Sequence, residues 1–454
     1  MQTLMPTIRP SMLVPGIGGF TLGSRLWDVA GRIPSLDLRF ADNKSLVDAT
    51  TGANLVTFTR ASSGTYVDSQ GVIKTAATNE ARFDHNPTTG ESLGLLVEEQ
   101  RTNSVRNNTM VGAVAGTPGT NPTSWGYVTT QSNGLTQSII GTGTENGINY
   151  IDYRFNGTTV ASPNAIAFGI EGLAGTAATG QTWTGSMYFR LVNGTLTGVN
   201  STQIGLIENT SGGSFVSGAL YTVTAPTSAS LITQRATATR TLSGGATVGI
   251  CALTLSINVA GSTAIDFTLR IGLPQLEQGA FATSVIPTLG TAAVTRSADV
   301  ASISGSNFSS WYRQDEGTLF ADVQASANAN TAYATISNGS QTSNSIYFDN
   351  DFGNIRNVIF SGSSAIAVLG LGTVGTVGAF NKLSTAYKVD NFAAVRNGGT
   401  VGTDTLGSVP ISVSQMNLGT NTSGTSSSYI NGTIRRLTYW PQRLPNATLQ
   451  EITR

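Results

Sequence analysis

The feature that most constrains this chain is the alternation of short apolar segments with glycine-containing turns, with almost no helical periodicity. Turns such as Asn133-Gly134, Asn156-Gly157 and Asn193-Gly194 interrupt the region between residues 104 and 290. Several short strands with regular turn spacing predict a β-sandwich or jelly roll. The predicted strands are residues 148–155, 165–170, 182–191, 203–208, 219–223, 246–257 and 265–271.

The flanking segments also predict strands. Residues 35–40 and 55–60 alternate polar and apolar side chains, which is the period-two pattern of a half-buried strand. Residues 317–323 and 387–396 predict further strands, and residues 444–452 predict one short helix with Asn446 as its candidate N-cap. The predicted fold class is therefore all-β, with a small N-terminal β unit, two β-sandwich (jelly-roll-like) domains and one short C-terminal helix.

Composition divides the chain into four predicted parts. Residues 1–34 are rich in proline and glycine yet carry many large apolar side chains, so we expect them either to bury against another protein or to fold back on their own domain. A small β base domain over 35–103, a jelly roll over 104–298 and a second sandwich over 299–454 follow. The candidate anchoring residues of the first part are Met12, Leu13, Val14, Phe20, Leu26 and Trp27.

The composition also narrows the function classes. Lys+Arg and Asp+Glu number 25 each, and charged residues make up 11% of the chain, against ~25% in average soluble proteins. This balance argues against a nucleic-acid partner. One cysteine, Cys251, and one histidine, His85, leave no intrachain disulfide, no cofactor or metal cluster and little room for histidine-based catalysis. No apolar run reaches the ~18 residues of a membrane span, and the N-terminus lacks a secretory signal pattern, so we expect assembly in the cytosol.

Residues 81–103, ARFDHNPTTGESLGLLVEEQRTN, combine a turn, a buried apolar strand and an abrupt polar patch, which predicts a junction between domains. This stretch resembles a signature of tailed-bacteriophage virion appendage proteins, the tail fibres, head fibres and spikes. Residues 273–279, 282–288 and 295–299 resemble a second signature of the same proteins, except that Val285 stands where they have an aromatic residue. Residues 429–452 resemble the close of concanavalin-like (laminin-G-like) sandwiches, and the middle region resembles carbohydrate-binding-module-like jelly rolls.

The resemblance implies a bacteriophage structural protein located on the virion, a fibre or spike subunit that contributes to adhesion to host-surface glycans. It further implies attachment to other phage structural proteins through the N-terminal segment and a homo-oligomer, with a trimer favoured. One alternative is a capsid or tail decoration protein with a purely structural role. A polysaccharide depolymerase is a further alternative.

The acidic residues do not predict an enzyme. Glycoside hydrolysis needs two carboxylates across a sugar ring, but Asp315 and Glu316 are neighbours and would point to opposite faces of a strand. The loop at Asp349 and Asp351 offers oxygen ligands but lacks the twelfth-position glutamate of an EF-hand, so an Asx turn is favoured over a calcium site. Aromatic faces beside polar side chains suit sugars, although each aromatic residue could instead pack in the core or rim. The candidate glycan-binding residues are Trp125, Tyr127, Tyr347, Asp349, Asp351 and Phe352.

Overall fold

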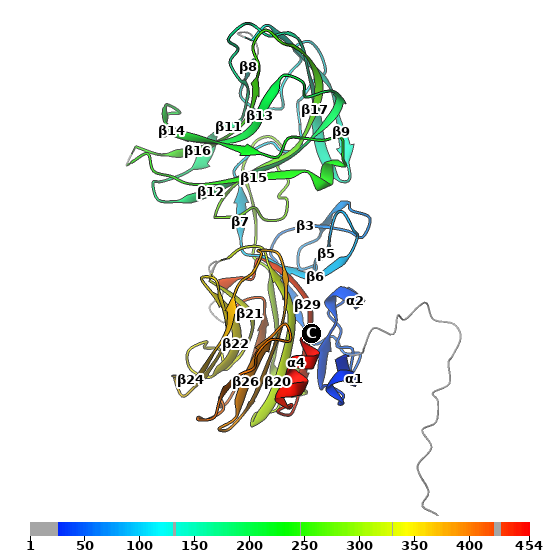
Figure 1. Ribbon diagram of the computed structural model, residues 1–454, viewed down its shortest axis with the longest axis vertical. Helices are drawn as coiled ribbons and strands as arrows, with labels where there is room; N and C mark the ends of the chain where they lie inside the picture. The colour runs from blue at the N-terminus through cyan, green and yellow to red at the C-terminus, as the bar shows by residue number, and fades with distance from the viewer. Residues whose placement is uncertain (1–25, 130–132, 246, 329, 422–427) are drawn as a thin grey trace, which may run out of the picture.

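The computed structural model describes residues 26–129, 133–245, 247–328, 330–421 and 428–454. Two β-sandwiches lie one above the other along the long axis, with a narrower waist between them (Figure 1). The described residues form 29 strands and four short α-helices. The predicted all-β fold class with two sandwiches and one short C-terminal helix is confirmed.

The upper sandwich has two five-stranded sheets, with strand orders β15-β12-β17-β10-β9 and β14-β13-β16-β11-β8. Ile151, Tyr153 and Phe155 are spaced two apart in β10 and are fully buried, as the period of a strand requires. Tyr153 and Phe155 pack edge-to-face on Phe168 of the opposite sheet. The strands are β8 (Val128–Thr129), β9 (Leu135–Glu145), β10 (Ile148–Thr158), β11 (Ile166–Thr176), β12 (Thr182–Gly194), β13 (Val199–Asn209), β14 (Phe215–Val223), β15 (Arg235–Thr241), β16 (Ile250–Val259) and β17 (Ala264–Gln278).

The lower sandwich packs an eight-stranded sheet, β27-β26-β25-β20-β29-β6-β5 with β1 also on β29, against a seven-stranded sheet, β2-β19-β28-β21-β22-β23-β24. Its early strands are β1 (Leu36–Leu38), β2 (Thr57–Thr59), β5 (Phe83–His85) and β6 (Ser92–Val97). Its later strands are β19 (Val300–Ser304), β20 (Glu316–Ala325), β21 (Thr331–Ser337), β22 (Ser345–Asp351), β23 (Asn354–Ser361), β24 (Ser364–Thr373), β25 (Phe380–Lys388), β26 (Phe392–Arg396), β27 (Gly402–Asp404), β28 (Gln415–Leu418) and β29 (Gly432–Trp440).

The N-terminal β unit expected over residues 35–103 does not stand apart as a base domain. Its strands β1 and β6 pair with β29, and β2 pairs with β19. Leu36, Phe58 and Leu95 belong to the same buried core as Tyr439. The hairpin of β3 (Gly64–Val67) and β4 (Ile73–Ala76) forms a separate two-stranded sheet. Local sequence patterns predict strands but not which distant strand completes the sheet, and this explains the difference.

The upper sandwich is thus a continuous insertion into the lower one. The chain leaves through β7 (Arg101–Asn103) and returns through β18 (Val294–Arg296), which pair antiparallel. The buried core of the upper sandwich is assembled from residues between Val105 and Leu276. The chain therefore passes between the two main cores through the paired strands β7 and β18.

Short helices cover one surface of the lower sandwich. Helix α4 (Asn446–Ile452) confirms the predicted C-terminal helix, but Asn446 is its first residue rather than its cap, which is Pro445. Leu449 of α4 is fully buried in a cluster that includes Leu26 of α1 (Leu26–Ala30) and Trp440 of β29. Two other short helices, α2 (Phe40–Asn43) and α3 (Gly305–Ser309), lie in loops. No helix among the described residues is long and apolar enough to cross a bilayer.

Candidate functional site

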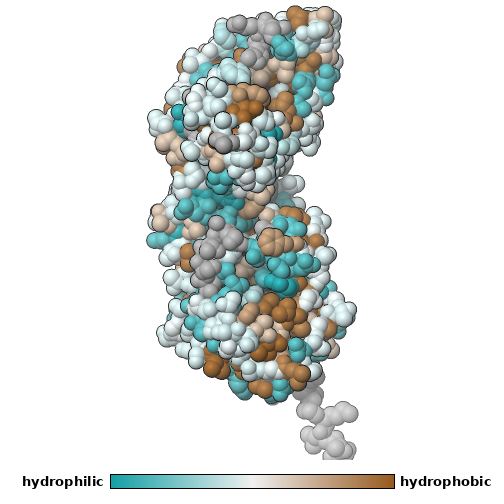
Figure 2. Space-filling view, turned by 90° about the vertical axis from the view of Figure 1, so that its left-hand side faces the viewer, coloured by the Kyte–Doolittle hydropathy of each residue, from teal (hydrophilic) through white to brown (hydrophobic). Residues whose placement is uncertain are grey.

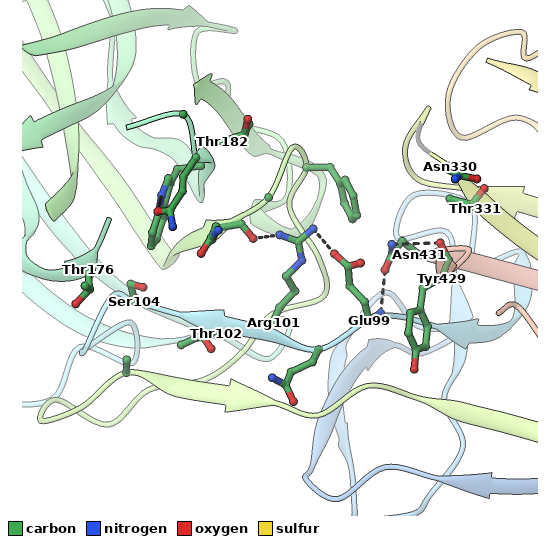
Figure 3. A pocket seen from close by; sticks show the side chains of 18 residues that line it. Glu99, Arg101, Thr102, Ser104, Thr176, Thr182, Asn330, Thr331, Tyr429 and Asn431 are labelled. Atoms are coloured by element: carbon green, nitrogen blue, oxygen red, sulfur yellow. Dashed lines mark hydrogen bonds and ion pairs between the residues drawn. The ribbon is translucent and has the colours of Figure 1, made fainter. Parts of the chain in front are cut away.

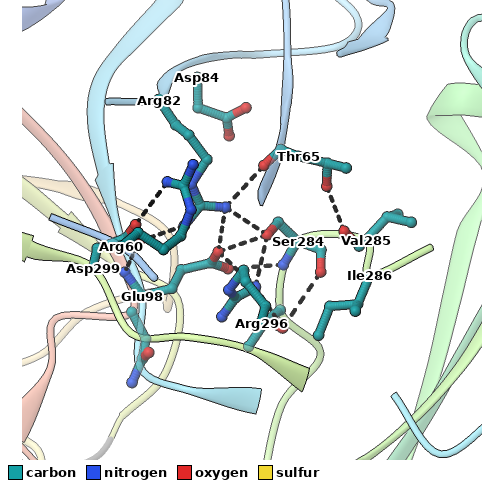
Figure 4. A network of polar contacts seen from close by, with 12 residues as sticks. Arg60, Thr65, Arg82, Asp84, Glu98, Ser284, Val285, Ile286, Arg296 and Asp299 are labelled. Atoms are coloured by element: carbon teal, nitrogen blue, oxygen red, sulfur yellow. Dashed lines mark hydrogen bonds and ion pairs between the residues drawn. The ribbon is translucent and has the colours of Figure 1, made fainter. Parts of the chain in front are cut away.

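The two sequence signatures meet at the waist in a buried network of charges (Figure 4). Asp299, which is fully buried, accepts hydrogen bonds from Arg60 Nη1 at 3.1 Å, from Arg82 Nη2 and from the Glu98 backbone N–H at 2.9 Å. Both guanidinium groups have no exposed side-chain surface. Arg82 of the first signature therefore binds Asp299 of the second through an ion pair that is buried away from water.

Glu98 extends this network to the segment that follows β17 and to β18. It receives hydrogen bonds from Ser284, at 2.8 Å from the backbone N–H and at 2.6 Å from the hydroxyl, and its carboxylate lies 2.8 Å from Arg82 Nη1 and 2.9 Å from Arg296 Nη1. Burial alone would raise the pKa of Glu98, but Arg296, Arg82 and Ser284 together lower it to about 2. The network fastens the segment that follows β17 to the segment that follows β6.

Beside this network, a groove of about 970 Å³ lies between the two sandwiches (Figure 3). The side chains that line it come from β7, from the start of β12, from the segment after β17, and from the loops before β21 and β29. Hydrophilic side chains gather at this waist on the surface of the molecule (Figure 2). The lining residues are Glu99, Gln100, Arg101, Thr102, Ser104, Thr176, Gly180, Gln181, Thr182, Trp183, Gln278, Gly279, Phe281, Ala293, Asn330, Thr331, Tyr429 and Asn431.

The chemistry of the groove is dominated by amides, hydroxyls and three aromatic rings. Trp183 donates its Nε1–H to Gln181 Oε1 at 3.2 Å. The guanidinium carbon of Arg101 lies 4.8 Å from the centre of the Phe281 ring, and the same group pairs with Glu99. Burial raises the pKa of Glu99, opposed by Arg101. Amides and hydroxyls beside aromatic faces suit a neutral ligand rich in hydroxyl groups.

Three of the predicted glycan-binding residues come together in a neighbouring cleft of about 220 Å³ on the seven-stranded sheet. Tyr347 is 6% exposed and stacks on Phe360, with ring centres 6.5 Å apart. Arg356 lies between the other two, at 2.7 Å from Asp349 Oδ2 and 2.7 Å from Asp351 Oδ2. The cleft shares Asn330 and Thr331 with the groove.

Phe352 lies outside this cleft. It occupies the tip of the β22–β23 hairpin, where it is 76% exposed and has a φ of 46°. Asn350 Oδ1 accepts the Gly353 backbone N–H at 2.8 Å, which makes the predicted Asx turn. Within the described ranges, no group of three His, Cys, Asp or Glu side chains is placed to hold a metal ion.

The remaining predicted glycan-binding residues lie on the upper sandwich and do not line the groove. Trp125 is 9% exposed and donates its Nε1–H to the Asn107 carbonyl at 2.7 Å, so it acts as a packing residue. Tyr127 is 59% exposed, and its backbone carbonyl accepts a hydrogen bond from Gly169 of β11. The structure thus distributes the six predicted residues over separate locations.

Two of the predicted anchoring residues pack on the chain's own lower sandwich. Leu26 is buried against the sheet, and Trp27 donates its Nε1–H to Asp37 Oδ2 at 2.9 Å beneath the guanidinium of Arg39. Met12, Leu13, Val14 and Phe20 lie outside the described residues.

The groove itself was not predicted from the sequence. Trp183 lies in the strand predicted over residues 182–191, where it is 3% exposed and also forms part of the groove wall. One usable signal was the abrupt polar patch over residues 98–103, which ends the first signature. The contributions of Asn330 and Asn431 depend on pairing between distant segments and carried no local signal.

Comparison with protein-family models found no match, and comparison with curated proteins found none either. Among solved structures, the chain is similar to the NanB sialidase of Streptococcus pneumoniae, with 19% identity over 34% of this chain and a TM-score of 0.28. It spans 26% of that sialidase. A SAP-like pentraxin from Limulus polyphemus matches with 13% identity over 31% of this chain and 70% of the pentraxin, with a TM-score of 0.24. Domains LG4-5 of the mouse laminin α1 chain match with 9% identity over 62% of this chain and 85% of theirs, with a TM-score of 0.21. The fold assignment rests on the strand order of the sheets.

Proposed function

We propose that this chain is a glycan-binding subunit of a bacteriophage virion appendage, of the fibre or spike type, and that the groove at the waist is its binding site. The phage context is supported by the two signatures, whose residues build the waist. The N-terminal segment would attach the subunit to other virion proteins, and the subunit would act as a homo-oligomer. The observation that carries the glycan proposal is the lining of the groove, in which amides and hydroxyls surround three aromatic rings and the one ion pair is internally neutralised.

Binding is favoured over hydrolysis by the state of the carboxylates. Glu99 is the one carboxylate among the described residues that line the groove, and it is paired with Arg101. In the adjoining cleft, Asp349 and Asp351 are both paired with Arg356. A retaining or inverting glycosidase needs two carboxyl groups free to transfer protons or attack the sugar. We therefore propose that the subunit is not a depolymerase.

The proposal is tested by titrating the purified full chain with host-surface polysaccharide and with a panel of defined oligosaccharides, using isothermal titration calorimetry. The exposed amides Gln100 and Gln278 line the groove, and Gln70 lies in a turn that is not part of it. We expect the double variant Gln100→Ala/Gln278→Ala to bind at least tenfold more weakly than the wild type, while Gln70→Ala binds like the wild type.

If the wild-type chain binds no glycan in this assay, the glycan-binding proposal is wrong and a purely structural decoration protein becomes the better account. New reducing ends after incubation with host polysaccharide would instead support a depolymerase. Equal losses in the groove variant and in Gln70→Ala would place the binding site elsewhere.

A further inference from the structure

The groove and the cleft adjoin at Asn330 and Thr331, and each arginine that lines them is paired with a carboxylate. We propose, building on the glycan-binding function, that together they form one extended site for an uncharged oligosaccharide chain and discriminate against acidic glycans. The inference concerns the ligand class and the length of the site, and it can fail while glycan binding itself holds.

The two hollows adjoin at the start of β21. This strand begins at Thr331, which lines both hollows, and its next residue, Ala332, pairs with Asp349 in the floor of the cleft. Asn330, which is exposed, also lines both. The groove and the cleft therefore share a border at these two residues, and a ligand that extends past the exposed Asn330 would reach the cleft.

The size of the site supports an extended ligand. The groove, at about 970 Å³, is already at the upper end of the range for drug-sized ligands, which corresponds to roughly two or three linked sugar rings. The cleft adds a further hollow of about 220 Å³, whose wall includes the edge of Tyr347. A disaccharide would occupy only part of this length, so each added sugar should gain contacts until the cleft is filled.

The charge selectivity follows from the two arginines. Arg101 donates through Nη1 to the Gln278 carbonyl and pairs through Nη2 with Glu99. Arg356 donates through Nε and Nη2 to Asp349 and pairs through Nη1 with Asp351. Each guanidinium group is thus already paired with at least one carboxylate of the protein.

The lining side chains of the two hollows comprise three carboxylates and two guanidinium groups, so the site carries a net charge of −1. A sugar carboxylate would find both arginines already paired with carboxylates and would meet a net like charge in a partly desolvated groove. A neutral sugar offers only hydroxyl groups and apolar ring faces, which the amides and aromatic rings can meet. Binding of the neutral ligand should also be insensitive to salt.

The experiment uses the full chain and matched probes. The tightest-binding neutral glycan of the panel is prepared as oligosaccharides of two, four and six residues, and a second hexasaccharide sample has its primary hydroxyls oxidised to carboxylates. We expect affinity to rise at least tenfold from the disaccharide to the hexasaccharide, and the oxidised hexasaccharide to bind at least tenfold more weakly than its neutral parent.

Variants locate the two ends of the site. Thr342 is exposed and lines only the cleft, so Thr342→Trp should obstruct the far end of the site and weaken the hexasaccharide while leaving the disaccharide unchanged. Gln70→Ala serves as the control. Affinity that is independent of length, equal binding of the oxidised probe, or no effect of Thr342→Trp on the hexasaccharide would each overturn the inference although a glycan still binds. Absence of all binding would instead overturn the proposed function.

Discussion

Asp299→Asn should lower the free energy of unfolding, because it removes a negative charge from the buried network at the waist. Asp299 is fully buried and balances two guanidinium groups, those of Arg60 and Arg82, that have no exposed surface. Asparagine preserves the size of the side chain but removes its negative charge. It leaves the arginines close to one another with one fewer counter-charge, and its amide group would face donors rather than acceptors.

Removal of one partner from a buried ion pair typically costs about 3–5 kcal/mol, because the remaining charge stays buried without compensation. Here one carboxylate serves two arginines and also accepts the Glu98 backbone N–H, so we expect a cost within that range. The matched control is Arg154→Gln. Arg154 pairs with Asp266 in a solvent-accessible ion pair on the upper sandwich, and such pairs contribute little to stability.

Urea unfolding measured by tryptophan fluorescence can test this prediction, because Trp311 and Trp440 report on the lower sandwich and Trp125 and Trp183 on the upper one. Asp299→Asn should lower the free energy of unfolding of the lower sandwich by about 3–5 kcal/mol, and Arg154→Gln should leave it nearly unchanged. If Asp299→Asn lowers the free energy of unfolding by less than about 1 kcal/mol, the buried charges are compensated in another way and Asp299 is not their main counter-charge.

Three further perturbations test other parts of the structure. Gly94 has a φ of 94°, and a Cβ at this position would lie 2.1 Å from the Ile434 carbonyl oxygen. Gly94→Ala should therefore destabilise the chain by at least about 3 kcal/mol in thermal unfolding. A melting temperature equal to that of the wild type would contradict the pairing of β6 with β29. Burial raises the pKa of Asp322 to about 6, so the protonated carboxyl is favoured in the folded state and its contribution to stability is lost as the pH rises through about 6. Asp322→Asn should therefore stabilise the protein by up to about 2 kcal/mol at pH 7 and by much less at pH 4. A gain in stability that does not depend on pH would contradict this. Residues 104–293 can be replaced by an Asn-Gly turn between Asn103 and Val294, which pair with each other. The remaining lower sandwich should still unfold cooperatively, as measured by circular dichroism. An aggregated or unfolded product would show that the insertion is needed for the lower core.

A truncation at residue 300, close to the domain boundary that the sequence predicts between residues 298 and 299, would not be an equivalent test. Residues 301–454 do not form a complete sandwich, because β1 and β6 pair with β29 and β2 pairs with β19. Such a truncation would leave the N-terminal strands without their sheets. Its failure to bind host cells would then report misfolding rather than the location of the binding site.

Much of the strand content could be predicted from the sequence because the strong strands have clear apolar patterns. Each of the seven strands predicted between residues 104 and 290 overlaps an observed one, from β10 to β17. Strands β9 and β15 were missed because both lie at sheet edges and their sequences, LTQSIIGTGTE and RATATRT, contain few apolar residues in regular alternation. Edge strands bury less of their surface, so their periodicity is weak.

The arrangement of the strands could not be predicted in the same way. Val97 pairs with Gly432, far along the chain, and no local feature of either segment indicates that partner. The groove depends on the same long-range pairing, because Thr102 on β7 and Asn330 before β21 come together only when both sandwiches are complete. The sequence did indicate the junction at residues 81–103, where turn, strand and polar patch follow one another.

If the proposed function and ligand class are right, the waist groove holds a neutral glycan. A crystal structure of the full chain with the tightest-binding neutral hexasaccharide tests it most directly. We predict a sugar ring against Phe281, hydrogen bonds to Gln100 and Gln278, and continuation of the chain past Asn330 into the cleft beside Tyr347. A hexasaccharide bound on another surface, with the groove holding only water, would contradict the claim.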